Sequence, residues 1–297
     1  MVSRRTLMEA AFQTLPATLR YEVWDVFTST RFGGNPLAVF FDSDGLSDEQ
    51  RFALTREMNH SETTFVTRDG KVRIFTATQE LPFAGHPVLG TAFALRRRNP
   101  GASTITVQVR QGPIPVTFQG ATAMMVQQDP EFRELHDTKF LAPLLGLKPE
   151  DLVADLPIQN VSTGRPNLIV VVKTIEAIKA AKFNWPALQD YFSKGDIQRG
   201  IYLLSPATLD RRNQLHARKL TPRLEDPATG SAAGCAAAYA VKHRLIAANT
   251  VAQMEQGHFM NRPSEILISA ARSASGRIEK IRVGGSSVLV FSGTTEA

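Results

Sequence analysis

The chain has 297 residues, of which 43 % are hydrophobic and 21 % are charged, as in ordinary globular proteins. These proportions exclude a disordered or fibrous protein, and no apolar run reaches the ~18 residues that a membrane-spanning helix needs. The 34 Lys and Arg exceed the 28 Asp and Glu by six, and their densest run has no interleaved aromatic residues, so we expect neither a nucleic-acid nor a membrane partner.

Cysteine and histidine usage argues against a metal site. Cys235 is the single cysteine, so the chain can form no internal disulfide and no cysteine-rich zinc site. This usage favours a reducing compartment, and we expect the cytoplasm. The six histidines show neither His-x-x-x-His nor His-x-His spacing, and we therefore expect no bound metal.

Residues 1–20 are expected to form an extension ahead of the first domain. They carry Arg4, Arg5 and Arg20 against Glu9 and lack the apolar core of about 7–15 residues that a secretory signal needs. An amphipathic helix or a loose extension is the favoured interpretation. An organelle-targeting segment is the alternative that stays open.

Short strands interrupted by a few helices are predicted in the first half of the chain. A capping box at Ser47 and Gln50 predicts a helix to about Asn59, and a second helix is expected from about Pro87 to the arginines at 96–98. Runs of β-branched and aromatic residues predict the strands, at 21–28, 36–41, 63–67, 71–76, 104–109, 114–118 and 123–128.

The second half continues this mixture. An Ala-rich helix is expected at 229–244, and the apolar run at 168–172 predicts a buried strand. Further strands are predicted at 200–204, 215–220, 251–256, 265–269, 280–283 and 288–291. Because strands and helices do not alternate regularly, the pattern favours an α+β fold.

Two segments half a chain apart share one pattern, a glycine-bearing turn followed by a helix of small residues. They are FAGHPVLGTA at 83–92 and DPATGSAAG at 226–234. Two similar domains would explain the pattern, and chance similarity of two Ala/Gly-rich helices is the alternative. If both helices begin in one cleft, their free N–H groups would bind a carboxylate, with Gly85 and Gly230 admitting the ligand close to the backbone.

Several polar residues near these turns have both a structural and a functional interpretation. Glu62 alone would be a surface carboxylate, His86 either caps its helix or contacts a ligand, and Asp226 is either a turn residue or a functional group. Ser231 fits a helix-cap hydroxyl, since no Gly-x-Ser-x-Gly elbow is present. Cys235 falls inside its helix, which favours a buried apolar role.

Segments in family order resemble the PhzF-like phenazine-biosynthesis family from about residue 21 to the end. The resemblance implies a diaminopimelate-epimerase-like α+β fold, with two pseudo-symmetric domains that each wrap a curved mixed sheet around a central helix. The expected domains are 21–130, completed by the last strand at about 287–297, and 131–286. The matching segments are DVFT (25–28), GNPLAVF (34–40), NHSETTFV (59–66), LPFAGHP (81–87), EDPATGSAAG (225–234), and QG with RPS (256–257, 262–264).

The resemblance also implies a function. Family members are cofactor-independent isomerases, usually homodimers, with a cleft between the domains that holds a small carboxylate-bearing substrate. The named enzyme moves hydrogen within a dihydro-hydroxyanthranilate. Carried over by motif, the catalytic carboxylate is Glu62, polar site residues are His86 and Asp226, and the anion-holding turns contribute Gly85 and Ser231.

One departure narrows the chemistry. Related epimerases and racemases use two cysteines as acid and base, and the corresponding positions here are Ala84 and Pro227. A two-thiol mechanism is therefore excluded, and the hypothesis is that Glu62 removes a proton from one carbon and delivers it to another. A non-catalytic small-anion-binding protein and a one-base epimerase stay open as alternatives.

Overall fold

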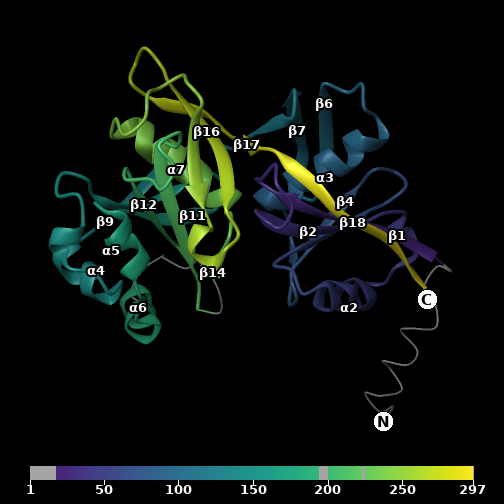
Figure 1. Cartoon of the computed structure of the whole chain (residues 1–297), viewed down its shortest axis with the longest axis horizontal. Helices are drawn as coiled ribbons and strands as arrows, with labels where there is room; N and C mark the ends of the chain where they lie inside the picture. Colours follow the sequence, from purple (N-terminus) through teal and green to yellow (C-terminus); the bar gives the residue numbers. More distant parts are fainter. Residues whose placement is uncertain (1–17, 194–199, 223–224, 297) are drawn as a thin grey trace, which may run out of the picture. The chain divides into compact units, whose positions relative to one another are not determined.

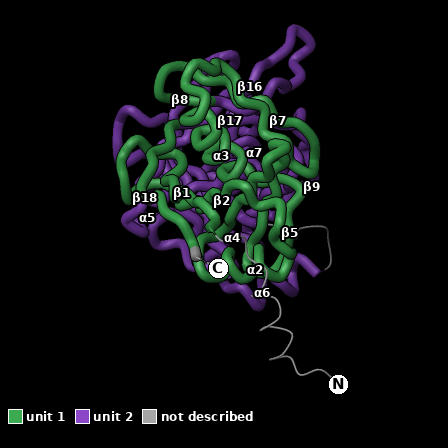
Figure 2. The backbone as a smooth tube through the Cα atoms, turned by 90° about the vertical axis from the view of Figure 1, so that its right-hand side faces the viewer, with its two compact units in different colours: residues 1–123, 286–297 green, residues 124–285 purple. Residues whose placement is uncertain are grey.

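The computed structural model describes residues 18–193, 200–222 and 225–296 (Figure 1). Of the expected extension, residues 1–17 lie outside the described residues, and residues 18–20 already belong to the first strand. The chain divides into two compact units, residues 1–123 with 286–297 and residues 124–285 (Figure 2). No helix within the described ranges has the length and apolarity to cross a bilayer.

Unit 1 contains, within the described residues, a six-stranded sheet of order β18-β1-β2-β3-β4-β5. β1 pairs antiparallel with β2 and also with β18, so the last strand of the chain belongs to the same sheet as the first. The carboxylate of Asp25 accepts the backbone N–H of Phe32 at 2.6 Å and orders the turn between β1 and β2. The strands are β1 (Thr18–Val26), β2 (Asn35–Phe40), β3 (Thr63–Val66), β4 (Val72–Phe75), β5 (Glu80–Leu81) and β18 (Ser287–Glu296).

Two helices of unit 1 follow from their sequences. The capping box predicted at Ser47 and Gln50 is confirmed and begins α2 (Asp48–Met58) after the short helix η1 (Ser43–Gly45). The second helix, α3 (Gly85–Arg98), begins two residues before the predicted Pro87. Its residues 85–92 are buried, because it contacts β1 and β2 as well as the hairpin of β6 (Thr104–Val109) and β7 (Gly112–Gln119).

Close packing of α3 on the sheet depends on Gly90. A Cβ at this position would lie 2.6 Å from Leu37 Cδ2 and 2.7 Å from Val26 Cγ2. At the other end, Arg97 pairs with the buried Glu22 at 2.6 Å, and the Arg98 guanidinium lies 3.4 Å from the centre of the Phe41 ring. The arginine cluster therefore anchors the helix end to the sheet.

Unit 2 has the strand order β17-β16-β15-β13-β12-β11-β10-β9, with β14 paired to β13. α7 (Gly230–Lys242) contacts β10, β11, β16 and β17, and all residues from Ala232 to Val241 are buried. Such a helix, apolar on every side, is typical of a core position. The strands are β9 (Glu131–His136), β10 (Ile158–Ser162), β11 (Pro166–Val171), β12 (Ile201–Ser205), β13 (Leu215–Leu220), β14 (Glu225–Asp226), β15 (Ala252–Gln256), β16 (Ser264–Arg272) and β17 (Ile278–Gly285).

The remaining elements lie between these strands. β8 (Thr122–Val126) contains the boundary between the two units. A second apolar core in unit 2 gathers the faces of three short helices against β11 and β12. These helices are α4 (Thr138–Leu144), α5 (Ile175–Ala180) and α6 (Trp185–Phe192), and the short 3-10 helices are η2 (Pro149–Asp151) and η3 (His258–Met260).

The α+β class and most of the predicted strands are confirmed. Four described strands were missed, namely the two-residue strands β5 and β14 and the longer strands β9 and β10. β10 escaped detection because its buried residues include Gln159, Asn160 and Ser162, which hide the apolar pattern of a core strand. β9 ends the strand order of unit 2 and shows no alternation of buried and exposed residues.

Replacement of Gly90 by valine tests the packing of α3. The new side chain meets Leu37 and Val26, and overpacking of this kind costs about 1–3 kcal/mol of unfolding free energy. The matched control is Gly101→Val, since a Cβ at Gly101 has no atom within 4 Å. Urea unfolding of both variants measures the difference, and an equal midpoint for the two would contradict the packing argument.

Candidate active site

Unit 1 brings together two residues that the sequence singles out. Glu62 lies in the connection between α2 and β3, and His86 is the second residue of α3. Glu62 Oε2 is 3.8 Å from His86 Nε2, and their side chains are 17 % and 7 % exposed. The distance is longer than a hydrogen bond but within ion-pair reach of a protonated imidazole. Catalytic contacts are often loose before a ligand binds, so the pair has the geometry of an acid/base couple.

The start of α3 beside this pair has no side-chain cap. Its N-cap residue, Ala84, has no side-chain acceptor, and the first turn contains no acidic residue. The first N–H groups of a helix have no partner inside it and carry the positive end of the helix dipole. Gly85 and His86 occupy these first positions, where the helix dipole favours a negative charge.

Unit 2 repeats this arrangement at the start of α7. The N-cap residue is Thr229, yet its side chain does not cap the helix. The Thr229 hydroxyl instead donates to Asp226 Oδ2 at 2.6 Å. Gly230 and Ser231 then begin the helix with no acidic residue in its first turn. The hydroxyl is thus used to orient Asp226, and the helix start stays available to an anion.

Gln256 holds the 226–230 turn in place. Its Nε2 donates to the carbonyl oxygen of Asp226 at 2.7 Å, and its Oε1 accepts the backbone N–H of Thr229 at 3.2 Å and the hydroxyl of Tyr202 at 2.7 Å. Gln256 and Tyr202 are fully buried. The Ser264 hydroxyl also donates to the carbonyl oxygen of Pro227 at 2.9 Å. The QG and RPS motifs noted in the sequence therefore support the Asp226 turn, a role that sequence spacing does not reveal.

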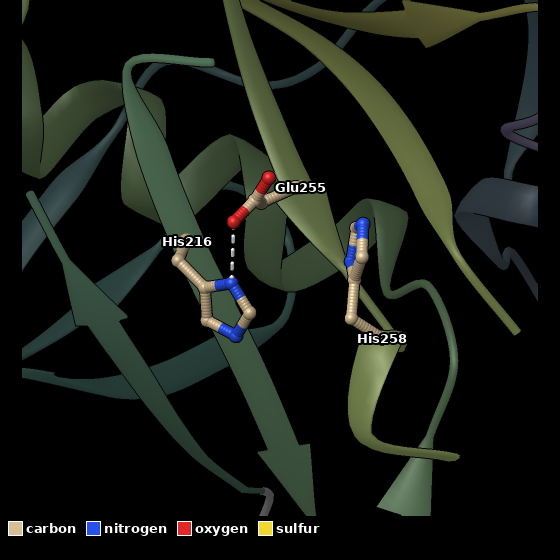
Figure 3. Close-up of side chains that lie close together, drawn as sticks. All are labelled: His216, Glu255 and His258. Atoms are coloured by element: carbon tan, nitrogen blue, oxygen red, sulfur yellow. Dashed lines mark hydrogen bonds and ion pairs between the residues drawn. The ribbon is translucent and has the colours of Figure 1, made fainter. Parts of the chain in front are cut away.

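His216 forms a second polar cluster in unit 2 with Glu255 and His258, which lie about 40 residues later in the chain (Figure 3). His216 on β13 and Glu255 on β15 are register partners in a parallel pair, and His258 lies in η3. Within the described part of the chain, these side chains are close enough to share an ion, with ligand atoms within 4.8 Å of one another. Histidine spacing alone could not predict this cluster.

The hydrogen bonds of Glu255 favour a structural role for the cluster. Its carboxylate is paired with His216 Nδ1 at 2.7 Å and accepts the side-chain amide of Asn213 at 2.6 Å. It also accepts the backbone N–H groups of Leu209 and Asp210 at 2.6 and 3.1 Å. Burial opposes ionisation of Glu255, but these bonds outweigh it and hold its pKa below the usual value. Both oxygens are thus engaged in ordering residues 209–213.

Cys235 is buried in α7, as its position in the sequence predicts. Burial raises the pKa of the thiol, so it is protonated at neutral pH. The Sγ atom lies 3.4 Å from the carbonyl oxygen of Ser231, one turn earlier. The thiol therefore lacks the lowered pKa that a nucleophilic cysteine needs.

Comparison with known proteins identifies the family. The model of the phenazine biosynthesis-like protein family, PhzC-PhzF, matches residues 24–293. The chain belongs to this family. The trans-2,3-dihydro-3-hydroxyanthranilate isomerase of Pseudomonas aeruginosa is 33 % identical over 291 residues, which cover 92 % of this chain and 98 % of the relative.

Solved structures agree in fold. A Bacillus anthracis phenazine biosynthesis protein of the PhzF family has a TM-score of 0.84 at 25 % identity, over 94 % of this chain and 99 % of its own. A hydroxyproline epimerase from Agrobacterium vitis has a TM-score of 0.61 at 9 % identity, over 96 % of this chain and 94 % of its own, a likeness of fold alone. The expected diaminopimelate-epimerase-like fold is confirmed.

The relatives also decide the class of protein. The relatives at about 33 % identity are named as isomerases, and the match covers nearly their whole length. This PhzF-family protein is likewise an isomerase. The non-catalytic binding protein is therefore the less favoured of the functions considered from the sequence. The roles of Glu62, His86, Gly85, Asp226, Gly230 and Ser231 remain predictions.

Loss of Gln256 should destabilise unit 2 more than loss of its tyrosine partner. Gln256→Leu removes the acceptor of the Tyr202 hydroxyl and of the Thr229 N–H, and it removes the donor to the carbonyl oxygen of Asp226. Each buried group left unsatisfied costs about 1–3 kcal/mol of unfolding free energy. Tyr202→Phe removes one hydrogen bond, worth about 0.5–1.5 kcal/mol. Chemical unfolding of the two variants checks this order, and an equal loss would contradict the role of Gln256.

The Glu255 cluster should make the unfolding free energy depend on pH. Because the pKa of Glu255 is lowered in the folded chain, its contribution is present above the unfolded value of about 4.3 and is lost as the pH falls below it. At pH 7, Glu255→Gln should cost at least about 1.5–3 kcal/mol, the worth of one charged hydrogen bond. The difference from the unmodified protein should shrink below pH 4, and a constant difference across this range would disprove the linkage.

Proposed function

We propose that this isomerase moves a proton between two carbons of a small carboxylate-bearing substrate, amino-acid-like or cyclic, by acid/base catalysis and without a cofactor. The pair of Glu62 and His86 at the open start of α3 carries the proposal. A carboxylate close to an imidazole, both largely buried, suits reversible transfer of a proton to and from carbon.

Glu62 is assigned the proton transfer itself. It accepts a proton from one carbon, which leaves the electron pair delocalised as an enolate-like anion, and then returns the proton to a second carbon. Acid and base are thus the same group at successive steps. Positioned acid/base catalysis of this kind contributes about 10²–10⁴-fold to the rate.

His86 and Gly85 are assigned the stabilisation of the negative charge that develops on the substrate. The N–H groups at the start of α3 offer hydrogen bonds to a carboxylate or enolate oxygen, and oxyanion donors of this type are worth about 2.7–4 kcal/mol. The 3.8 Å separation between His86 Nε2 and Glu62 Oε2 allows the imidazole to orient the carboxylate. His86 thereby stabilises both the carboxylate of Glu62 and the negative charge that develops on the substrate.

Unit 2 is assigned substrate recognition. Asp226, held by the hydroxyl of Thr229, is proposed to bind an amino or hydroxyl group of the substrate and to assist proton relay. Gly230 and Ser231 supply the free N–H groups at the start of α7 for an anionic group. The two-thiol chemistry of other enzymes with this fold is absent at Ala84 and Pro227, which supports a carboxylate as the acid and base.

The activity for which the Pseudomonas aeruginosa relative is named makes trans-2,3-dihydro-3-hydroxyanthranilate the first substrate to test. A panel of small cyclic amino-carboxylates should be tested beside it, because a shared fold hosts many substrates. Thermal stabilisation ranks the panel, since a ligand at a hundred times its dissociation constant adds about 2.7 kcal/mol.

Glu62→Gln should lower kcat by about 10²–10⁴-fold while the substrate dissociation constant changes little, because the amide keeps the shape but cannot accept the proton. Glu57→Gln, the same change at an exposed position of α2, is the matched control and should leave both unchanged. Turnover is measured with the ranked substrates in D₂O, with carbon-bound deuterium read by NMR and binding read by calorimetry.

The outcomes separate the alternatives. Full turnover by Glu62→Gln would remove Glu62 from the mechanism. Deuterium exchange with inversion at a single centre would identify a one-base epimerase. Binding of a substrate without any exchange in the unmodified protein would support a non-catalytic role for this site.

A further inference from the structure

A buried lysine lies directly across the sheet from Asp226. Lys219 on β13 is the register partner of Asp226 on β14 and also of Tyr202 on β12. Side chains of register partners project from the same face, so the three residues form one row across three neighbouring strands. Lys219 is only 5 % exposed, and neither the sequence motifs nor the proposed mechanism accounts for it.

The ammonium group of Lys219 occupies a tight polar space. It donates to Asn167 Oδ1 at 2.5 Å, and Asn167 is itself buried. A Cβ at residue 200 would overlap Lys219 Nζ, so the glycine there provides the room for the amine. The chain thus keeps a specific place for a cation where an apolar side chain would be the usual occupant.

The charges around this amine come from three directions. Asp226 on β14 favours the charged form, Arg165 before β11 opposes it, and Cys235 on α7 would favour it only as a thiolate. Tyr202 on β12 completes the row, and its pKa is raised by burial and by the charge of Asp226. A buried charge without a partner is costly, so the carboxylate of Asp226 is the main compensation for the cation.

We propose that Lys219 is a positioning residue for Asp226, whose carboxylate it keeps ionised and fixed at the start of α7. The two charges stabilise each other across β13 and β14. When Lys219 loses its proton at alkaline pH, Asp226 loses its counter-charge and is held by the Thr229 hydroxyl without the support of a cation. The effect on catalysis rests on the function proposed for Asp226, whereas the coupling of the two charges does not.

Burial lowers the pKa of Lys219 to about 8, which brings its titration close to the working range of an enzyme. Below this pH the ammonium is present and Asp226 has its partner. Above it, the amine is neutral. The interaction between Lys219 and Asp226 is therefore lost as the pH rises through about 8.

NMR titration of the selectively labelled lysine side chains tests the coupling without any assay of activity. The Lys219 signal is assigned by its loss in Lys219→Met and should titrate near pH 8, against about 10.4 for an unperturbed lysine. Asp226→Asn should move this midpoint to lower pH, because the carboxylate that favours the ammonium is gone. Lys242 on α7 is the matched control, since burial alone lowers its pKa, and it should not respond.

A reciprocal measurement guards against an Asp226 variant that fails to fold. In Lys219→Met, the carboxyl signal of Asp226 should titrate at a higher pH than in the unmodified protein. A Lys219 midpoint among those of the exposed lysines, or an Asp226 carboxyl that ignores Lys219→Met, would overturn the proposal.

The pH profile of kcat/KM then tests the consequence for catalysis. Lys219→Met should lose the alkaline limb near pH 8 and move the acid limb to higher pH. Lys219→Arg, which stays charged, should lose the alkaline limb but keep the acid limb. If the NMR coupling is present and both profiles match the unmodified protein, Asp226 is not part of the chemistry, and the function proposed for it fails while the coupling stands.

Discussion

Each unit buries a helix of small residues against its own sheet, and the candidate site depends on this burial. α7 is enclosed from Ala232 to Val241, and α3 is enclosed from Gly85 to Leu89 and beyond. A helix held this firmly cannot tilt or fray at its first turn. The N–H groups of its first turn therefore have fixed directions, and preorganised donors of this kind are what an anion site requires.

The polar groups near these helix starts serve the site more than the helices. Thr229 is a good capping residue by type, yet its hydroxyl binds Asp226 and leaves the helix uncapped. A lost cap costs about 0.5–2 kcal/mol. Gln256 and Ser264 offset part of that cost by binding the carbonyl oxygens of the same turn. Local stability is thus lower at a helix start where the proposed reaction needs N–H donors.

Sequence reasoning succeeded where a local pattern determines local structure. The capping box at Ser47, the small-residue helices and the apolar strands all follow from periodicity and turn chemistry. It also marked Glu62 and His86, which the fold brings within 3.8 Å, although only the family resemblance linked them. Sequence reasoning did not predict which polar residues are buried. Gln159 in β10, Lys219 in β13 and the pair of His216 and Glu255 look like surface residues in the sequence, because their partners come from strands far away in the chain.

The pairing of β1 with β18 has a consequence for how the protein is made. The first described strand of the chain finds one of its two neighbours only among residues 287–296, so the sheet of unit 1 stays incomplete until those residues have been synthesised. Unit 2 is a continuous segment of residues 124–285 and is synthesised in full before that moment. Its core can form during translation, while one edge of β1 stays unpaired until β18 has been synthesised.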